Sequence, residues 1–203
     1  MSDRYEIRVA GSGGQGVILA AVIIGQAAAL MEDGINSVQT QAYGPEARGG
    51  ASKSEVVLAR GEIDYPKAAR PHLQVMLTQK ACDKYAADTK RGGIVILDDL
   101  HVRRTPEIDA EIHHLPIAKT ARDVIGREVV TNMIALGTVA RVLEIGGRLR
   151  PESIRHTIKV AVPKGTEEMN CRAFDLGYRL MKERKIRLRH RERKAPGRFW
   201  LPA

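Results

Sequence analysis

The chain has few cysteines and few aromatic residues, and each shortage narrows what it can be. Its 203 residues include two cysteines, Cys82 and Cys171, with no second cysteine or histidine at ligand spacing. This spacing excludes a zinc site or an iron–sulfur cluster on this chain and predicts two ordinary buried thiols. Aromatic residues make up 4% of the sequence, so we expect an aliphatic core.

The sequence also lacks a long hydrophobic run and a secretory signal. The longest apolar stretch, 17–31, is too short to cross a bilayer and is interrupted by Gly25 and Gln26. The first six residues contain no basic region followed by an apolar segment. We therefore expect a cytoplasmic protein without a membrane span.

The net charge of +9 is concentrated at the C-terminal end. Between Lys182 and Arg198 there are nine Lys or Arg residues and two Glu, so the rest of the chain is nearly neutral. We divide the sequence into a domain at 1–185 and a basic tail at 186–203. Three roles remain open for the tail: contact with an acidic partner subunit, which we favour, a solvated helix end, or nucleic-acid binding, which we favour least.

Short β-prone runs alternate with helical patterns along the chain. The predicted strands are 6–10, 36–41, 52–59, 73–78, 94–97 and 112–115, and the predicted helices are 15–31, 80–90, 117–125, 132–145, one beginning at 151, and 166–185. Such alternation indicates a parallel sheet. We predict one α/β domain, a doubly wound, mostly parallel sheet of the Rossmann or flavodoxin type, with a helical C-terminal third.

Three local features add detail to this prediction. Gly34 is expected to end the first helix as its C-cap. The strand at 52–59 alternates polar and apolar residues, which predicts one wetter side. Thr166 is expected to cap the last helix.

The first candidate site is a glycine-rich turn with G-x-G-x-x-G spacing between the first strand and the first helix. It consists of Gly11, Ser12, Gly13, Gly14, Gln15 and Gly16. Without side chains in the way, backbone N–H groups could bind a phosphate at the helix N-terminus. The second strand ends in Gln39-Thr40-Gln41 and has no acidic residue for a ribose, so an NAD site is disfavoured. Three interpretations remain open: a ligand phosphate, close packing only, or contact with another subunit's cofactor.

The second candidate site is the loop that follows the second strand. Its candidate residues are Tyr43, Gly44, Glu46, Arg48, Gly49 and Gly50. In a doubly wound fold this loop should share a crevice with the glycine turn, where Arg48 could pair with a phosphate or carboxylate and Glu46 could orient it. Ser52 and Ser54 should face the same side and could donate to the same ligand. The alternative is a surface loop with a local Glu46–Arg48 pair.

Three segments together resemble one protein family. They are Gly-Ser-Gly-Gly-Gln-Gly-Val at 11–17, Tyr-Gly-Pro-Glu-Ala-Arg-Gly-Gly at 43–50 and Ser-Lys-Ser-Glu-Val at 52–56. The combination closely resembles the gamma subunit of 2-oxoacid:ferredoxin oxidoreductases. The likeness continues through 132–137 and 170–177, whereas the tail beyond Lys185 departs from the family.

The resemblance implies an enzyme complex that oxidatively decarboxylates a 2-oxoacid with CoA to acyl-CoA and CO2 and passes electrons to ferredoxin. It implies that thiamine diphosphate, Mg²⁺ and [4Fe–4S] clusters are held by alpha, beta and delta-type partner subunits, because this chain lacks their binding motifs. It implies no catalytic residue, bound cofactor or metal ligand on this chain alone. The substrate it favours is 2-oxoglutarate, with an aromatic 2-oxoacid such as phenylglyoxylate as the alternative.

The resemblance also implies that residues 11–16 and 43–54 form a wall near the entry for thiamine or CoA, with backbone amides and Arg48 facing an anionic group. Two other functions stay open. One is a stand-alone nucleotide or CoA phosphate-binding module. The other is a nucleic-acid-binding protein that acts through its basic tail and binds with a steep dependence on salt.

Overall fold

The computed structural model describes residues 4–42 and 50–187. Its strands are β1 (Tyr5–Ser12), β2 (Asn36–Ala42), β3 (Ala51–Ala59), β4 (Leu73–Met76), β5 (Gly93–Asp98) and β6 (Ala110–Leu115). Its helices are α1 (Val17–Met31), α2 (Gln79–Tyr85), α3 (Ile117–Thr120), α4 (Thr131–Ile145), α5 (Pro151–Ala161) and α6 (Glu167–Lys182). Three short turns of helix complete the list: η1 (Ala86–Asp88), η2 (Ala121–Ile125) and η3 (Glu128–Val130). None of the helices in these ranges is long and apolar enough to cross a membrane.

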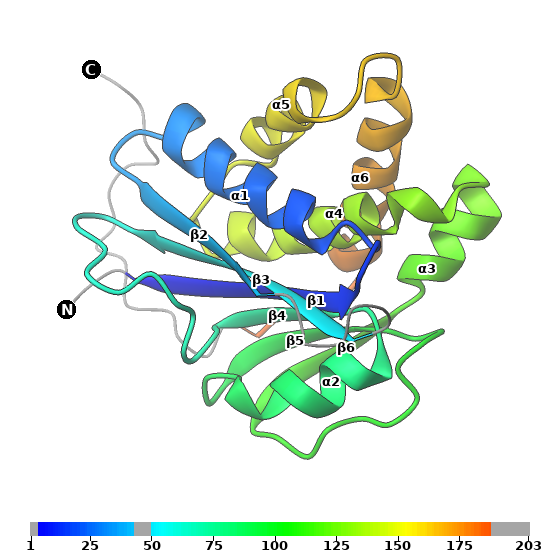
Figure 1. Cartoon of the computed structure of the whole chain (residues 1–203), viewed down its shortest axis with the longest axis horizontal. Helices are drawn as coiled ribbons and strands as arrows, with labels where there is room; N and C mark the ends of the chain where they lie inside the picture. The colour runs from blue at the N-terminus through cyan, green and yellow to red at the C-terminus, as the bar shows by residue number, and fades with distance from the viewer. Residues whose placement is uncertain (1–3, 43–49, 188–203) are drawn as a thin grey trace.

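The six strands form one sheet in the order β2-β3-β1-β4-β5-β6. Strands β1, β4, β5 and β6 pair in parallel, whereas β3 is antiparallel to both β1 and β2. Only β3 therefore runs against the other described strands (Figure 1). The predicted mostly parallel α/β sheet is confirmed.

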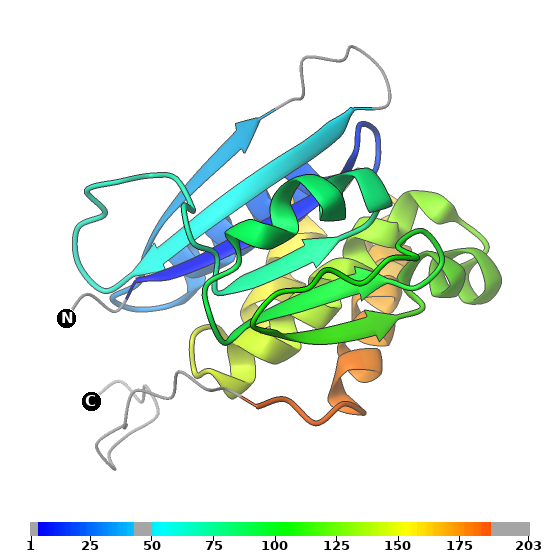
Figure 2. The same cartoon turned by 90° about the horizontal axis from the view of Figure 1, so that it is seen from below.

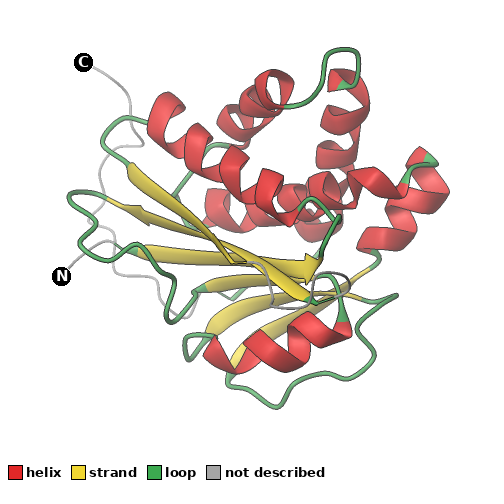
Figure 3. Cartoon of the chain, viewed as in Figure 1, coloured by secondary structure: helices red, strands yellow, loops and turns green. Residues whose placement is uncertain are grey.

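Helices cover both faces of the sheet, as a doubly wound fold requires. α1, α4, α5 and α6 lie on one face and α2 on the other (Figures 1 and 3), and the view from below shows α2 crossing the sheet (Figure 2). The larger apolar cluster lies under the four helices and the smaller one under α2. Their buried members are aliphatic or sulfur-containing apart from Phe174 and Tyr85, so the expected aliphatic core is confirmed.

The α2 face of the sheet also holds a buried ionic network. Arg8 on β1 and Glu55 on β3 are 2% and 3% exposed, and Arg8 Nε donates to Glu55 Oε1 over 2.8 Å. Arg8 also donates to Asp88 and to the carbonyl of Ala68, and Glu55 pairs with Lys53. The predicted wetter side of this strand is therefore wrong, because its charged residue is paired and covered by α2 and the 60–72 loop.

Several predicted helix ends also differ from the structure. Glu32, not Gly34, is the C-cap of α1, and Gly34 adopts a φ of 69° in the turn leading to β2. Thr166 occupies the N-cap position of α6 but its hydroxyl donates to the carbonyl of Pro163 instead of capping the helix. The single helix predicted at 80–90 is divided into α2 and the 3-10 turn η1, which ends at Asp88. The helix predicted at 117–125 is likewise divided into α3 and the π-helical turn η2.

α4 and α6 cross in close backbone contact. A Cβ on Gly137 would lie 2.1 Å from the carbonyl oxygen of Phe174, and one on Gly177 would lie 1.9 Å from that of Ile134. Neither position can therefore carry a side chain without separating the two helices. This contact gives a structural reason for the two later segments of the sequence likeness, 132–137 and 170–177.

Candidate functional site

The two predicted site segments meet at one end of the strands, where β1 and β2 end and β3 begins. Ser12, the last residue of β1, pairs with Ala51, the first of β3, and Gly50 precedes that pair. The end of β2 lies at the same end of the sheet, because Ala42 pairs with Lys53. The remaining loop candidates lie outside the described residues: Tyr43, Gly44, Glu46, Arg48 and Gly49.

The glycine turn is closed by its own glutamine. The backbone N–H of Ser12 donates to Gln15 Oε1 over 2.8 Å, and the N–H of Gln15 donates to the carbonyl of Ser12 over 3.3 Å. Gly14 and Gly16 have φ values of 88° and 67°, a region that favours glycine. The turn is therefore a defined bend that delivers the chain from β1 into α1.

The four glycines of the turn separate into two pairs by what surrounds them. A Cβ on Gly16 would lie 2.3 Å from Asn132 Nδ2, and one on Gly11 would lie 3.2 Å from Leu77 Cβ and nearer still to Gln15. These two glycines serve packing. A Cβ on Gly13 or Gly14 would meet no described atom within 4 Å. Packing alone accounts for half of the motif and leaves Gly13 and Gly14 facing open space.

No side chain of α1 offsets the partial positive charge at the N-terminus of this helix. Gly16 is its N-cap and supplies no side chain, and the first turn contains no acidic residue. A helix of 15 residues ending this way attracts an anion through its dipole and unpaired N–H groups. Together with the open glycines, this end of α1 leaves room for an anionic group in front of the helix N-terminus.

Asn132 joins the site from α4, although it was not among the predicted site residues. Its Nδ2 donates to the carbonyl of Gly16 over 3.2 Å, and its side chain is 4% exposed. Its Oδ1 is buried without a hydrogen-bond partner among the described residues. The sequence signalled Asn132 only as part of the family likeness, because the contact joins residues 116 positions apart.

The two predicted serines differ in their freedom to bind a ligand. Ser54 Oγ accepts from Gln39 Nε2 over 2.7 Å and donates to the carbonyl of Thr40 over 3.1 Å. Its hydroxyl hydrogen is thus used to hold β2 against β3. Ser52 is also buried but lies opposite Gly11 in the β1–β3 register. Of the two, Ser52 is the better candidate for a ligand.

The described residues offer no place for a metal ion or an iron–sulfur cluster. No group of three His, Cys, Asp or Glu side chains within 4–42 and 50–187 is arranged to hold one. Cys82 and Cys171 are buried on α2 and α6, on opposite faces of the sheet, and burial raises the pKa of both thiols. A raised pKa keeps them in the unreactive thiol form, as expected for structural cysteines.

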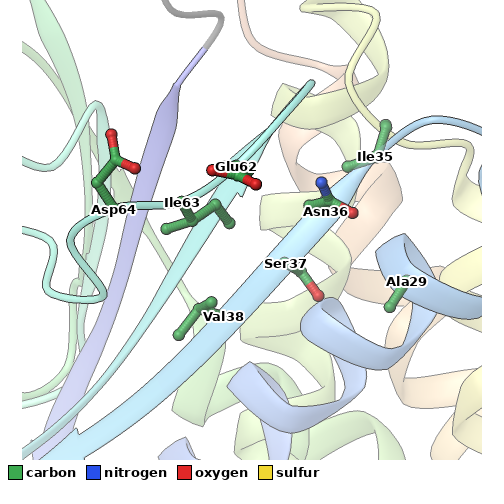
Figure 4. Close-up of a pocket in the computed structure, with 8 residues that line it drawn as sticks. All are labelled: Ala29, Ile35, Asn36, Ser37, Val38, Glu62, Ile63 and Asp64. Atoms are coloured by element: carbon green, nitrogen blue, oxygen red, sulfur yellow. The ribbon is translucent and has the colours of Figure 1, made fainter.

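A pocket of about 520 Å³ lies away from this site, at the opposite ends of β2 and β3. The start of β2, the end of α1 and the segment after β3 line it (Figure 4). The carboxylates of Glu62 and Asp64 belong to its wall, and none of the predicted site residues does. The pocket therefore contributes nothing to a site for an anion at the glycine turn.

Comparison with known proteins agrees with the fold and the sequence motifs. A family model described as pyruvate ferredoxin/flavodoxin oxidoreductase matches residues 6–180. The 2-oxoglutarate synthase subunit KorC of Methanocaldococcus jannaschii is 47% identical over 182 residues, which cover 89% of this chain and 95% of that protein.

Two solved structures share the architecture. The gamma subunit of a keto/oxoacid ferredoxin oxidoreductase from Geobacter sulfurreducens is 40% identical with a TM-score of 0.79, covering 88% of this chain and 97% of that one. A chain of the 2-oxoglutarate:ferredoxin oxidoreductase of Magnetococcus marinus has a TM-score of 0.78 at 21% identity, covering 90% of this chain and 32% of that one, so it supports the fold alone.

The expected resemblance to the gamma subunits is confirmed by these matches. The relatives are subunits of oxidoreductases that act on 2-oxoacids, and the match extends over almost all of the described α/β domain. The chain belongs to the pyruvate ferredoxin/flavodoxin oxidoreductase family.

Proposed function

We propose that this chain is the gamma subunit of a multi-subunit 2-oxoglutarate:ferredoxin oxidoreductase. The choice of 2-oxoglutarate is supported by the 47% identical relative, which is named as a 2-oxoglutarate synthase subunit. In the proposed reaction, 2-oxoglutarate and CoA give succinyl-CoA and CO2, and two electrons pass to ferredoxin. An aromatic 2-oxoacid is the alternative substrate.

The proposed role of this chain is to hold CoA beside the catalytic subunits. Thiamine diphosphate with Mg²⁺ would supply the carbanion chemistry and [4Fe–4S] clusters the electron path, and we assign both to the alpha, beta and delta-type partners. The cysteines of this chain cannot serve as cluster ligands together, because the sheet separates them. No acid–base or redox step is assigned to its own residues.

The observation that carries this role is the pair of glycines without a packing partner. Gly13 and Gly14 leave open space in front of the uncapped N-terminus of α1. A diphosphate could therefore approach the backbone N–H groups closely, with the helix dipole opposing its charge. CoA is the co-substrate of this reaction that carries a diphosphate.

The test is to purify the chain with its native partners and assay the complex. We expect thiamine- and cluster-binding subunits to co-purify, and we expect CoA-dependent ferredoxin reduction with 2-oxoglutarate that exceeds the rates with pyruvate, indolepyruvate and phenylglyoxylate. Recovery of the chain alone would overturn the subunit assignment and favour a stand-alone CoA-binding module. An aromatic 2-oxoacid as the best substrate would overturn only the choice of 2-oxoglutarate.

A further inference from the structure

One edge of the sheet is formed by β2, whose outer side is open. β2 stands at the end of the strand order and pairs with β3 alone among the described strands (Figure 2). This pairing is continuous over all seven residues of β2, without a bulge. The outward N–H and C=O groups of β2 therefore form a regular row that can pair with another strand.

The sequence of β2 does nothing to protect this edge. Soluble proteins usually block an edge strand with charged residues, proline or a bulge, and Asn36–Ala42 contains none of these. The opposite edge is different. β6 carries Glu111, and Glu111 Oε2 accepts from the backbone N–H of Arg187 over 2.7 Å, so the chain after α6 lies against that edge. β2 is thus the unprotected edge of the described sheet.

The helix beside this edge is also uncharged. Of the six described α-helices, α1 alone contains no Asp, Glu, Lys or Arg. It packs along β2, where Ser37 Oγ donates to the carbonyl of Gly25 over 2.7 Å. Ile18, Val22 and Ala29 share the side of α1 that includes Gly25, and they are half-buried or exposed. A helix that is apolar on nearly every side is typical of an element covered all round.

The surface made by α1 and β2 suits a second copy of itself. It offers backbone hydrogen bonds and small or apolar side chains, and neither element has a charge that would select a partner of opposite sign. Two carboxylates, Glu62 and Asp64, border the hollow of about 520 Å³ at the start of β2 (Figure 4). In an antiparallel pair of β2 strands the two starts lie roughly 20 Å apart, so these carboxylates do not repel each other.

We propose that two copies of this chain pair through antiparallel β2 strands about a two-fold axis at Gln39, the middle residue of β2. All seven residues then have a partner, and Val38 of each copy lies opposite Thr40 of the other, a favourable pair of β-branched side chains. The axis is perpendicular to the sheet, so both α1 helices lie on one face and their apolar sides meet. The pairing depends neither on the substrate nor on CoA binding.

Disulfide cross-linking in the complex, purified with its native partners, tests this register. A cysteine at position 39 would face its copy across the axis at a Cα separation of roughly 5 Å, which a disulfide spans. We expect Gln39→Cys to give a covalent, reducible dimer of this chain under mild oxidation. His114→Cys, at an exposed position on β6, is the control and should give no dimer. The native Cys82 and Cys171 are buried and should not contribute.

Sedimentation velocity of the full-length chain tests the association itself. We expect the wild type to sediment at twice the mass of one chain. Val22→Lys brings two like charges together near the axis and should weaken self-association about tenfold or more. Val160→Lys adds the same charge at an exposed valine on α5, outside this surface, and should leave self-association unchanged. Circular dichroism should show the same fold for both variants.

Three results would overturn the pairing. The first is a wild-type chain that sediments as a monomer, or a Val22→Lys variant that associates as the wild type does. The second is a Gln39→Cys complex without the cross-link. The third is hydrogen exchange in which the β2 amides become protected only when the other subunits are added, because the edge would then bind a partner subunit.

Discussion

Asn132 Nδ2 donates a hydrogen bond to the carbonyl of Gly16 and so fastens the start of α4 to the N-cap of α1. The same amide occupies the space that a side chain at Gly16 would need, since a Cβ there would lie 2.3 Å from Nδ2. The two residues therefore set the position of the glycine turn jointly.

We predict that substitutions at these two positions are coupled. Gly16→Ala should destabilise the chain by a few kcal/mol, on the order of 2–3, because it adds both a clash and strain at positive φ. In an Asn132→Ala background the two closest contacts, with Nδ2 and Cγ, disappear, and the backbone strain remains with one tight contact of 3.3 Å to the Cβ at position 132. A double-mutant cycle from denaturant unfolding should show an interaction energy of about 1 kcal/mol. Strictly additive effects would mean that the amide moves aside freely.

We predict that Gly13→Ala separates binding from folding. No described atom lies within 4 Å of the added methyl group, and Gly13 has no positive φ. The free energy of unfolding should therefore change by no more than about 0.5 kcal/mol. The affinity of the complex for CoA should fall about tenfold or more, because the methyl group blocks close approach to the backbone.

The controls for Gly13→Ala come from the same turn and from α1. Gly16→Ala should lower stability itself. Gly25→Ala lies inside α1, where the added Cβ would be 3.7 Å from its nearest neighbour, Gln39 Cβ on β2, and it should be neutral or stabilising. Unchanged CoA binding in Gly13→Ala would contradict a phosphate at this turn and return the motif to a packing role.

The α4–α6 crossing gives a third prediction. Gly137→Ala or Gly177→Ala should destabilise the chain by about 3 kcal/mol or more, since the methyl group meets rigid backbone instead of a movable side chain. Gly146→Ala, at the end of α4 with its nearest contact at 3.4 Å, serves as the matched control and should be close to neutral. Thermal unfolding followed by circular dichroism measures both, and equal melting temperatures for Gly137→Ala and wild type would show that the helices can part.

His113 on β6 gives a prediction about pH. The pKa of His113 is lowered from its ordinary value of 6.5, chiefly by burial, with Arg184 acting in the same direction and Glu111 opposing them. The unfolded chain therefore takes up a proton at this residue before the folded chain does. The resulting stability is present above the ordinary pKa and is lost as the pH falls through it.

Unfolding by urea between about pH 7 and about pH 5 tests this sign. The free energy of unfolding should decline less steeply toward acid in His113→Gln than in the wild type. His156→Gln changes an exposed histidine on α5 and should keep the wild-type slope. A His113→Gln slope equal to that of the wild type would rule out His113 as a source of acid sensitivity.

The elements that the sequence predicted well are those with local signals. Glycines mark the turn at 11–16, and uninterrupted aliphatic residues mark β4 and β5, so strand, turn and helix follow from neighbouring residues. The expectation that the two site loops share one end of the sheet followed from the general behaviour of doubly wound sheets. The order of the strands was not predicted, and antiparallel β3 lies between β2 and β1.

What could not be predicted depends on partners distant in the chain. Glu55 in isolation indicates a solvated strand face, and its burial follows only from Arg8, 47 positions earlier. In the sequence, Gly137 and Gly177 only lower the helix propensity of their segments. Their role becomes visible in the structure, where α4 and α6 cross in close backbone contact at these two residues. Asn132 has no local mark of a site residue, because its role arises from Gly16 on another element.

The reversed direction of β3 has a consequence for how this family can vary. Since β3 returns antiparallel to β2, the chain leaves and re-enters the sheet at one edge, and no crossover helix is needed there. Lengthening such a connection changes the closure entropy by only about 0.6 kcal/mol for each doubling. The β2–β3 connection between Ala42 and Gly50 can therefore change in length while the register of the two strands stays fixed.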